Sequence, residues 1–273
     1  MKKVIIGLYA VLLLIGCTGN KTDEAQNQDS VAAPSVADTD SISVKAEMPP
    51  TAADGLFDDF MYSFMRNRSF QIERIKFPLA VRTDGKTATL SKEEWKFDRF
   101  YSRNDVYTML FDDEKSVGRE KDSNVVHVIV EWIYLDKGRV KQYIFDKYNG
   151  RWMMTGVDAH SLAESTNKDF YDFYRRFSTD ESFQQQHIEN PFAFKTYDFD
   201  TYQELEGVLD VAQWADYRPE LPQKVITNIN YEQAYADNGN RVFVITSPSA
   251  GMSCTLHFKK KQSQWMLVGL ENI

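Results

Sequence analysis

Apolar residues recur every three or four positions in two segments of the chain, which is the spacing of one face of a helix. The first segment begins at Phe57 and the second at Phe170. Each pattern predicts an amphipathic helix whose apolar face packs on a core. The residues that form these faces are Phe57, Phe60, Met61, Phe64 and Met65 in the first segment, and Phe170, Phe173, Tyr174 and Phe177 in the second.

Two further helices are predicted in each half of the chain. A short helix is expected to begin at Ser69 and at Ser182, and each must end before the proline that follows it. A third helix is expected after the sequences 91–94 and 201–204, because a Ser or Thr followed three residues later by Glu is a capping box.

The rest of each half has the pattern of short strands separated by turn signals such as Asn149-Gly150. Helices followed by antiparallel strands predict an α+β fold, in which helices cross one face of a curved sheet. The predicted strands are 79–83, 106–111, 125–135, 140–148 and 151–157 in the first half, and 192–196, 225–231, 241–247, 252–259 and 264–270 in the second.

The two halves are also similar in sequence. Sliding the chain by 113 residues aligns 57–80 with 170–193, and ten of these 24 positions are identical. Chance at ordinary composition gives roughly one or two identities. The same offset aligns 145–157 with 258–270. We therefore predict two tandem repeats of one domain, at residues 51–160 and 164–273.

The N-terminus has the pattern of an export signal. Two lysines precede an apolar run from Val4 to Ile15, too short to span a bilayer permanently, and the run ends in Gly16-Cys17. This ending resembles the lipobox of bacterial lipoproteins. The resemblance implies a signal peptide at residues 1–16, cleavage before Cys17 and acylation of that cysteine.

Residues 17–50 predict a disordered acidic tether. The stretch from Thr18 to Gly55 has no aromatic residue, and its two lysines face seven acidic residues. Such a sequence cannot bury enough apolar surface to offset its chain entropy. The tether would separate the folded part from the membrane.

Composition limits the classes of function. The 273 residues are 42% hydrophobic and 14% aromatic, which supports a sizeable core, and the net charge of −8 argues against a nucleic-acid partner. Two cysteines exclude a disulfide scaffold and a four-cysteine zinc site. The usual catalytic, metal and phosphate-binding motifs are absent, so we predict no metal and no cofactor.

The order of elements over about 110 residues resembles the nuclear transport factor 2-like fold, a superfamily of cone-shaped α+β domains that includes ketosteroid isomerase and scytalone dehydratase. A cystatin-like fold is the alternative. With the lipobox, the tether and the duplication, the chain is similar to uncharacterised duplicated lipoproteins of Bacteroidetes. The resemblance implies that an enzyme of this kind would place an Asp, Glu or His inside an apolar cone.

One predicted strand carries such residues. In 125–133, strand alternation puts His127 and Glu131 on the same face. If that face lines the cone, Glu131 could act as a general base with His127 as its partner, and Tyr62, Trp95 and Tyr107 are the candidate pocket residues. The face could equally be solvent-exposed, or Glu131 could pair with a basic side chain on a neighbouring strand.

Three functions follow from these patterns. The first is a non-catalytic lipoprotein of the bacterial cell envelope, periplasmic or surface-exposed, that is anchored to the bilayer through Cys17 and binds a small molecule, a glycan or a protein. The second is a lyase, isomerase or hydrolase that uses Glu131 and His127. The third is an architectural role, in which the two repeats pack on each other.

Overall fold

The computed structural model describes residues 51–198, 200–201, 203–247 and 252–272, all within one compact unit, Glu47–Ile273. The predicted signal peptide at 1–16, the lipidation site Cys17 and the tether at 17–50 lie outside the described residues. No helix in the described part of the chain is long and apolar enough to cross a membrane.

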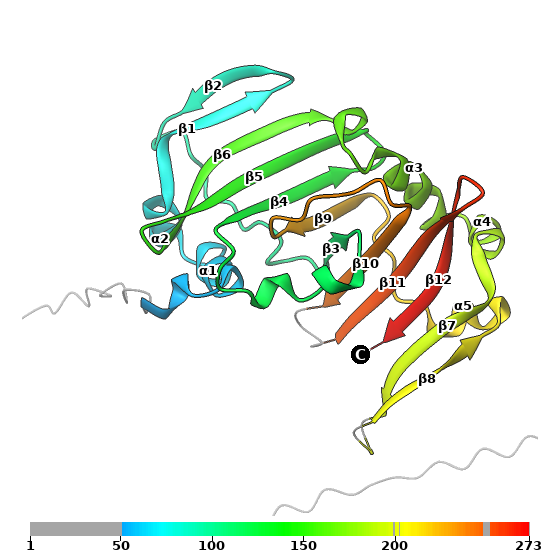
Figure 1. Cartoon of the computed structure of the whole chain (residues 1–273). Helices are drawn as coiled ribbons and strands as arrows, with labels where there is room; N and C mark the ends of the chain where they lie inside the picture. The colour runs from blue at the N-terminus through cyan, green and yellow to red at the C-terminus, as the bar shows by residue number, and fades with distance from the viewer. Residues whose placement is uncertain (1–50, 199, 202, 248–251, 273) are drawn as a thin grey trace, which may run out of the picture. The chain divides into compact units, whose positions relative to one another are not determined.

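The described strands form one twelve-stranded sheet, in the order β2-β1-β6-β5-β4-β9-β3-β10-β11-β12-β7-β8 (Figure 1). Most neighbours are antiparallel, but β1/β6, β3/β9 and β7/β12 are parallel. The strands are β1 (Ile75–Thr83), β2 (Lys86–Leu90), β3 (Tyr107–Phe111), β4 (His127–Tyr134), β5 (Arg139–Tyr148), β6 (Arg151–Ser161), β7 (Ile188–Asp198), β8 (Gln203–Leu209), β9 (Val225–Asn230), β10 (Asn240–Ser247), β11 (Met252–Lys261) and β12 (Gln264–Asn272).

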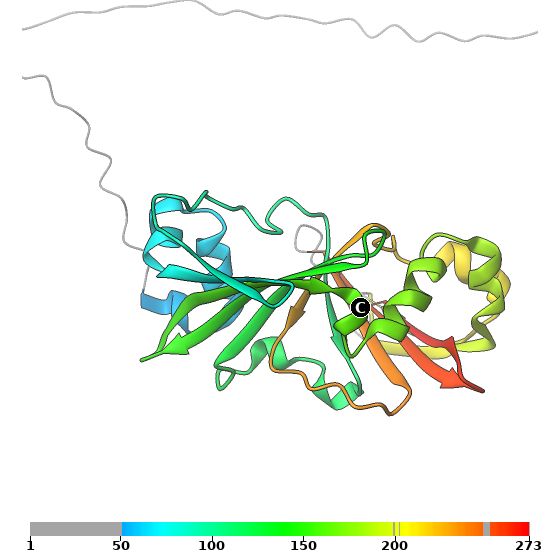
Figure 2. The ribbon, with the colours of Figure 1, turned by 90° about the horizontal axis from the view of Figure 1, so that it is seen from above.

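The α-helices are short and gather toward the two ends of this sheet (Figure 2). Both predicted amphipathic helices and both short helices after them are present. Asn67 and Asp180 cap the short helices by accepting a backbone hydrogen bond from the third residue that follows. The α-helices are α1 (Phe57–Phe64), α2 (Arg68–Glu73), α3 (Lys168–Phe177), α4 (Glu181–Gln186) and α5 (Trp214–Tyr217), and the 3-10 helices are η1 (Thr51–Asp54), η2 (Glu114–Ser116), η3 (Arg119–Lys121), η4 (Leu162–Glu164) and η5 (Val211–Gln213).

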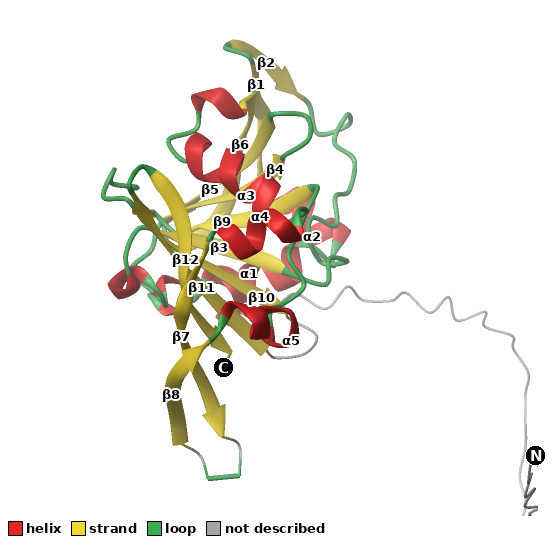
Figure 3. Cartoon of the chain, turned by 90° about the vertical axis from the view of Figure 1, so that its right-hand side faces the viewer, coloured by secondary structure: helices red, strands yellow, loops and turns green. Residues whose placement is uncertain are grey.

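The third helix predicted in each half is wrong. In the first half, the Glu94 carboxylate does accept a 2.8 Å hydrogen bond from the Ser91 backbone N–H, but the chain continues as a turn. In the second half, the residues after Thr201 form strand β8, which pairs with β7 along seven residue pairs. These two strands form a hairpin that extends beyond the rest of the sheet (Figure 3). In the second half, pairing with β7 overrides the local helix signal.

Strands β3 and β9 each pair with a strand from the other half of the chain. Strand β9 lies between β4 and β3, and β3 lies between β9 and β10. Each strand of the first half has a counterpart six places later in the chain, β1 in β7, β2 in β8 and so on. When every strand is exchanged for its counterpart, the order of strands is the original order read from the other end of the sheet. The structure thus has one continuous sheet where the sequence predicted a separate curved sheet in each half.

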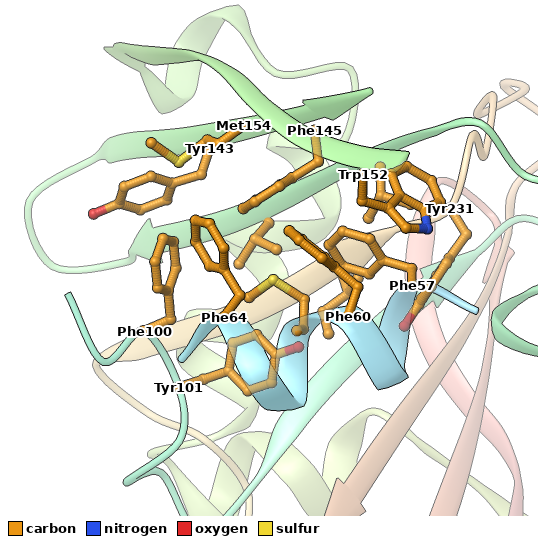
Figure 4. Close-up of a cluster of buried hydrophobic side chains, with 14 of the residues drawn as sticks. Phe57, Phe60, Phe64, Phe100, Tyr101, Tyr143, Phe145, Trp152, Met154 and Tyr231 are labelled. Carbon is orange, nitrogen blue, oxygen red and sulfur yellow. The ribbon is translucent and has the colours of Figure 1, made fainter. Parts of the chain in front are cut away.

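The central strands are apolar on both faces because each face supports a different core. Successive side chains of a strand point to opposite faces. Val242 and Val244 of β10 belong to the core under α1, while Phe243 and Ile245 belong to the core under α3. In the first core, Phe57, Phe60 and Phe64 extend from α1 toward Phe145 and Trp152 (Figure 4).

Candidate functional site

A cavity of about 410 Å³ lies beside the outer side of α1 and brings two of the predicted pocket residues together. Tyr62 comes from α1 and Tyr107 begins β3. The volume falls in the range of about 300–1,000 Å³ that is typical of small-molecule sites. The cavity is lined by Asp58, Tyr62, Met65, Arg66, Tyr101, Ser102, Asn104 and Tyr107.

Asp58 supplies the carboxylate of this cavity. Tyr231 is buried, with 1% of its surface exposed, and its hydroxyl donates a 2.5 Å hydrogen bond to Oδ1 of Asp58. Burial raises the pKa of the Asp58 carboxyl, and the negative charges of Glu120 and Asp59 add to the rise, while the hydrogen bond from Tyr231 opposes it. Asp58 is therefore poised to take a proton or accept hydrogen bonds from a ligand.

Two buried or half-buried tyrosines, Tyr101 and Tyr107, line the same cavity. Burial, with a contribution from the Asp58 charge, raises the pKa of Tyr107 to about 12 and raises that of Tyr101 as well. Both hydroxyls are therefore protonated at neutral pH and can donate hydrogen bonds. The cavity combines one acceptor carboxylate with donor hydroxyls on apolar rings.

Tyr62 and Arg66 form the exposed rim of the cavity. The Tyr62 side chain is 61% exposed, and the Arg66 guanidinium lies 3.8 Å from the centre of its ring. A guanidinium stacked on an aromatic face offers a ligand a flat surface and a positive charge at the entrance.

Trp95, the third predicted pocket residue, lies elsewhere. Its Nε1–H donates a 3.0 Å hydrogen bond to the side-chain oxygen of Gln71, and its ring packs on the first core. Gln71 is fully buried and also donates to the carbonyls of Phe64 and Asp98. Trp95 therefore links the loop after β2 to helix α2 through this hydrogen bond, and it lines none of the cavities described here.

Glu131 lies in a second cavity of about 350 Å³. Its Oε1 atom accepts a 2.8 Å hydrogen bond from the Gln142 side chain, and Oε2 accepts one of the same length from Asn228. Burial raises the pKa of the carboxyl, against the lowering effect of these two hydrogen bonds and of His160. The residue is partly exposed, so the cavity can be reached from solvent.

The structure does not bring His127 and Glu131 together. The β4–β5 register places His127 opposite Asp146 and Glu131 opposite Gln142. His127 Nδ1 lies 2.7 Å from the Asp146 carboxylate, which also accepts a 2.6 Å hydrogen bond from Thr155. Four residues along a strand span about 13 Å. Each predicted catalytic residue thus belongs to its own hydrogen-bond network.

The sequence pattern did not single out Asp58, the second residue of α1. An acidic residue in the first turn of a helix is common, since it interacts well with the helix dipole, and Asp58 and Asp59 are indistinguishable by pattern. The contact that sets Asp58 apart comes from Tyr231, in the other half of the chain. No local signal could have found it.

Comparisons with known proteins agree with this fold. The model of a family described as "Domain of unknown function (DUF4348)" matches residues 36–272. A crystal structure of an NTF2-like (nuclear transport factor 2-like) protein from Bacteroides fragilis NCTC 9343 is similar, with a TM-score of 0.76 and 35% sequence identity, over 82% of this chain and 98% of that chain. A comparison with curated proteins finds no match. The expectation of an α+β, nuclear transport factor 2-like fold is confirmed.

Proposed function

We propose that this chain, which belongs to the DUF4348 family of domains of unknown function, is a non-catalytic ligand-binding module of the bacterial cell envelope. In this proposal the acylated Cys17 holds the protein on a membrane, and residues 17–50 tether the folded part to it. Two acyl chains or more anchor a protein far more firmly than one, since each buried methylene contributes about 0.8 kcal/mol.

One observation carries the binding role: Asp58 shares a cavity of about 410 Å³ with two tyrosine hydroxyls and a stacked arginine. Apolar walls with a few convergent polar groups are the usual composition of a small-molecule site. A planar molecule that carries a hydroxyl group fits this chemistry, because its ring can lie against the tyrosines while its hydroxyl donates to Asp58.

A thermal-shift screen of hydroxylated aromatic compounds tests this role. A ligand that binds only the native state raises the unfolding temperature. Compounds that stabilise the protein should lose their effect in Asp58→Asn and keep it in Asp59→Asn, because Asp59 is exposed and lines neither of the two cavities described above. Equal stabilisation of both variants would show that the compounds bind elsewhere.

We also propose that the two halves are copies of one ancestral domain. The halves share the 113-residue sequence offset. In addition, a buried glutamine in the second α-helix of each half accepts a hydrogen bond from a tryptophan. Gln184 accepts a 2.9 Å hydrogen bond from Trp214 and donates to the carbonyl of Phe177, just as Gln71 does with Trp95 and Phe64. The offset of 113 residues relates Gln71 to Gln184.

Catalysis is the second candidate function, and the raised pKa of Glu131 favours it. A carboxyl that titrates closer to neutral pH is a better proton carrier. His127 contacts Asp146, and the histidine that lines this cavity is His160. If the protein is an acid–base enzyme, His160→Ala should reduce its rate at least tenfold, whereas His127→Ala should leave the rate unchanged.

A further inference from the structure

The Glu131 cavity is built from both halves of the chain. Strands β4, β5 and β6 form one wall. Residues 164–167 and Tyr171, before and within α3, form the second, and Asn230 at the end of β9 forms the third with residues 233–235. Figure 1 shows α3 close to the ends of these three strands. This cavity shares no lining residue with the Asp58 cavity.

Two residues that line the cavity each carry a buried polar atom with no hydrogen-bond partner among the described residues. These atoms are the hydroxyl of Tyr171 and the side-chain oxygen of Gln233, whose residues are 2% and 8% exposed. A buried polar group without a partner is costly, and most such groups in proteins are paired. One is a donor and the other an acceptor, so a ligand that satisfies both must carry groups of both kinds.

The charges that line the cavity are mainly negative. Glu131 and Glu164 contribute carboxylates, and no lysine or arginine is among the described residues that line it. Arg241 near Tyr235 keeps its positive charge behind the wall, because its partners, the Asn167 side chain and two backbone carbonyls, are neutral. The two lining carboxylates outnumber this one cation. The one lining group that can become cationic is His160. A ligand that carries a positive charge is therefore favoured over an anion.

We propose that this cavity is a second binding site, selective for small hydroxylated primary ammonium compounds. The ammonium group lies between the Glu131 carboxylate and the Gln233 oxygen, and a ligand hydroxyl accepts the hydrogen bond of Tyr171. Gln142 and Asn228 hold the carboxylate in place, since each donates to one of its oxygens. The site is independent of the ligand proposed for the Asp58 cavity.

Isothermal titration of the full chain with D-glucosamine tests the site, with D-glucose as the neutral analogue in which a hydroxyl replaces the ammonium group. We expect glucosamine to bind and glucose to bind at least about tenfold more weakly, because glucose cannot form the charged contact with Glu131. Equal affinity for the two sugars, or no binding of glucosamine at millimolar concentration, would overturn the proposal.

Three variants locate the binding. Glu131→Gln keeps the size of the side chain but removes its charge, and should weaken glucosamine binding about 30-fold. Tyr171→Phe removes one hydroxyl and should weaken it about fivefold. Asp58→Asn should leave it unchanged, and circular dichroism with urea unfolding confirms that each variant is folded. Unaltered binding in Glu131→Gln, or lost binding in Asp58→Asn, contradicts the assignment to this cavity.

Discussion

The carboxylate of Glu131 and the side-chain amide of Asn228 are joined by a 2.8 Å hydrogen bond, although 97 residues separate them in the chain. They lie opposite each other because β9 from the second half pairs with β4 from the first half. In return, β3 from the first half pairs with β10 from the second. Each half therefore completes its part of the sheet with a strand of the other.

This exchange predicts that residues 51–160 expressed alone do not form a stable monomer. Without β9 and β10, the edge of β4 and both edges of β3 are unpaired, and apolar side chains such as Ile133 lose their cover. We expect the fragment to aggregate or self-associate in size-exclusion chromatography. Co-expression with residues 161–273 should yield a soluble complex. A fragment that is monomeric and unfolds cooperatively by itself would show that the halves are independent.

The Glu131 carboxyl should make stability depend on pH. Its pKa is raised in the folded protein above the ordinary value of 4.5, so the fold favours the protonated form. The resulting contribution to the free energy of unfolding is fully present below pH 4.5 and is lost as the pH rises through the folded pKa. Glu131→Gln cannot ionise, so its stability relative to the wild type should increase from acidic to neutral pH in urea unfolding.

The matched control for this titration is Glu93→Gln, since Glu93 is exposed and lines none of the cavities described here. The pH-dependent increase in relative stability should be larger for Glu131→Gln than any change seen in this variant. Asp58, whose pKa is also raised, titrates in the wild type and in both variants and cancels from the comparison. A difference for Glu131→Gln that stays constant with pH would mean that the fold does not perturb the Glu131 carboxyl.

Gln71→Ala should lower the free energy of unfolding by about 2–4 kcal/mol. The substitution leaves the carbonyl of Phe64, the backbone N–H of Asp98 and the indole N–H of Trp95 without their partner. Gln184→Ala should have an effect of similar size, because it occupies the same position in the second half. Urea unfolding measures both.

Gln185→Ala provides the reference, since Gln185 is exposed and next to Gln184 in the same helix. Its effect should stay within about 0.5 kcal/mol. If Gln71→Ala and Gln185→Ala lowered the free energy of unfolding by the same small amount, the buried glutamine would not stabilise the loop that contains Trp95.

Local patterns predicted the elements better than their pairing. The helices that begin near Phe57 and Phe170 and most of the strands follow from apolar spacing, because that spacing reports which residues face a core. The third helix failed because a capping box describes only one turn of chain, whereas Trp95 is held by Gln71 and β8 is held by β7. The position of β9 beside β4 depends on contacts between distant residues, which no window of sequence contains.

The candidate sites show the same division. Glu131 could be recognised because a carboxylate in an apolar strand is unusual. Its supposed partner His127 shares a strand face with it, but the neighbouring strand β5 offers each residue a different partner. Tyr62 and Tyr107 do line one cavity, yet its carboxylate is that of Asp58. Faces of an element can be read from sequence, while the groups that meet across elements cannot.

Cys17→Ala tests the proposed anchor. If Cys17 is acylated, the wild-type protein should sediment with membranes and incorporate a labelled fatty acid, and the variant should do neither. Cys254→Ala is the control, because Cys254 is buried in the second core and should not be accessible to acylation. A variant at Cys17 that remains acylated and membrane-bound would remove this part of the proposal.

Fluorine NMR of protein labelled with 3-fluorotyrosine tests whether a ligand occupies the Asp58 cavity. Tyr→Phe variants assign the resonances, and Tyr217, which is exposed in α5, is the internal reference. Titration with a hydroxylated aromatic compound from the screen should shift the resonances of Tyr62, Tyr101 and Tyr107 and leave that of Tyr217 in place. If the cavity tyrosines do not respond while the compound still stabilises the protein, the compound does not bind in the Asp58 cavity.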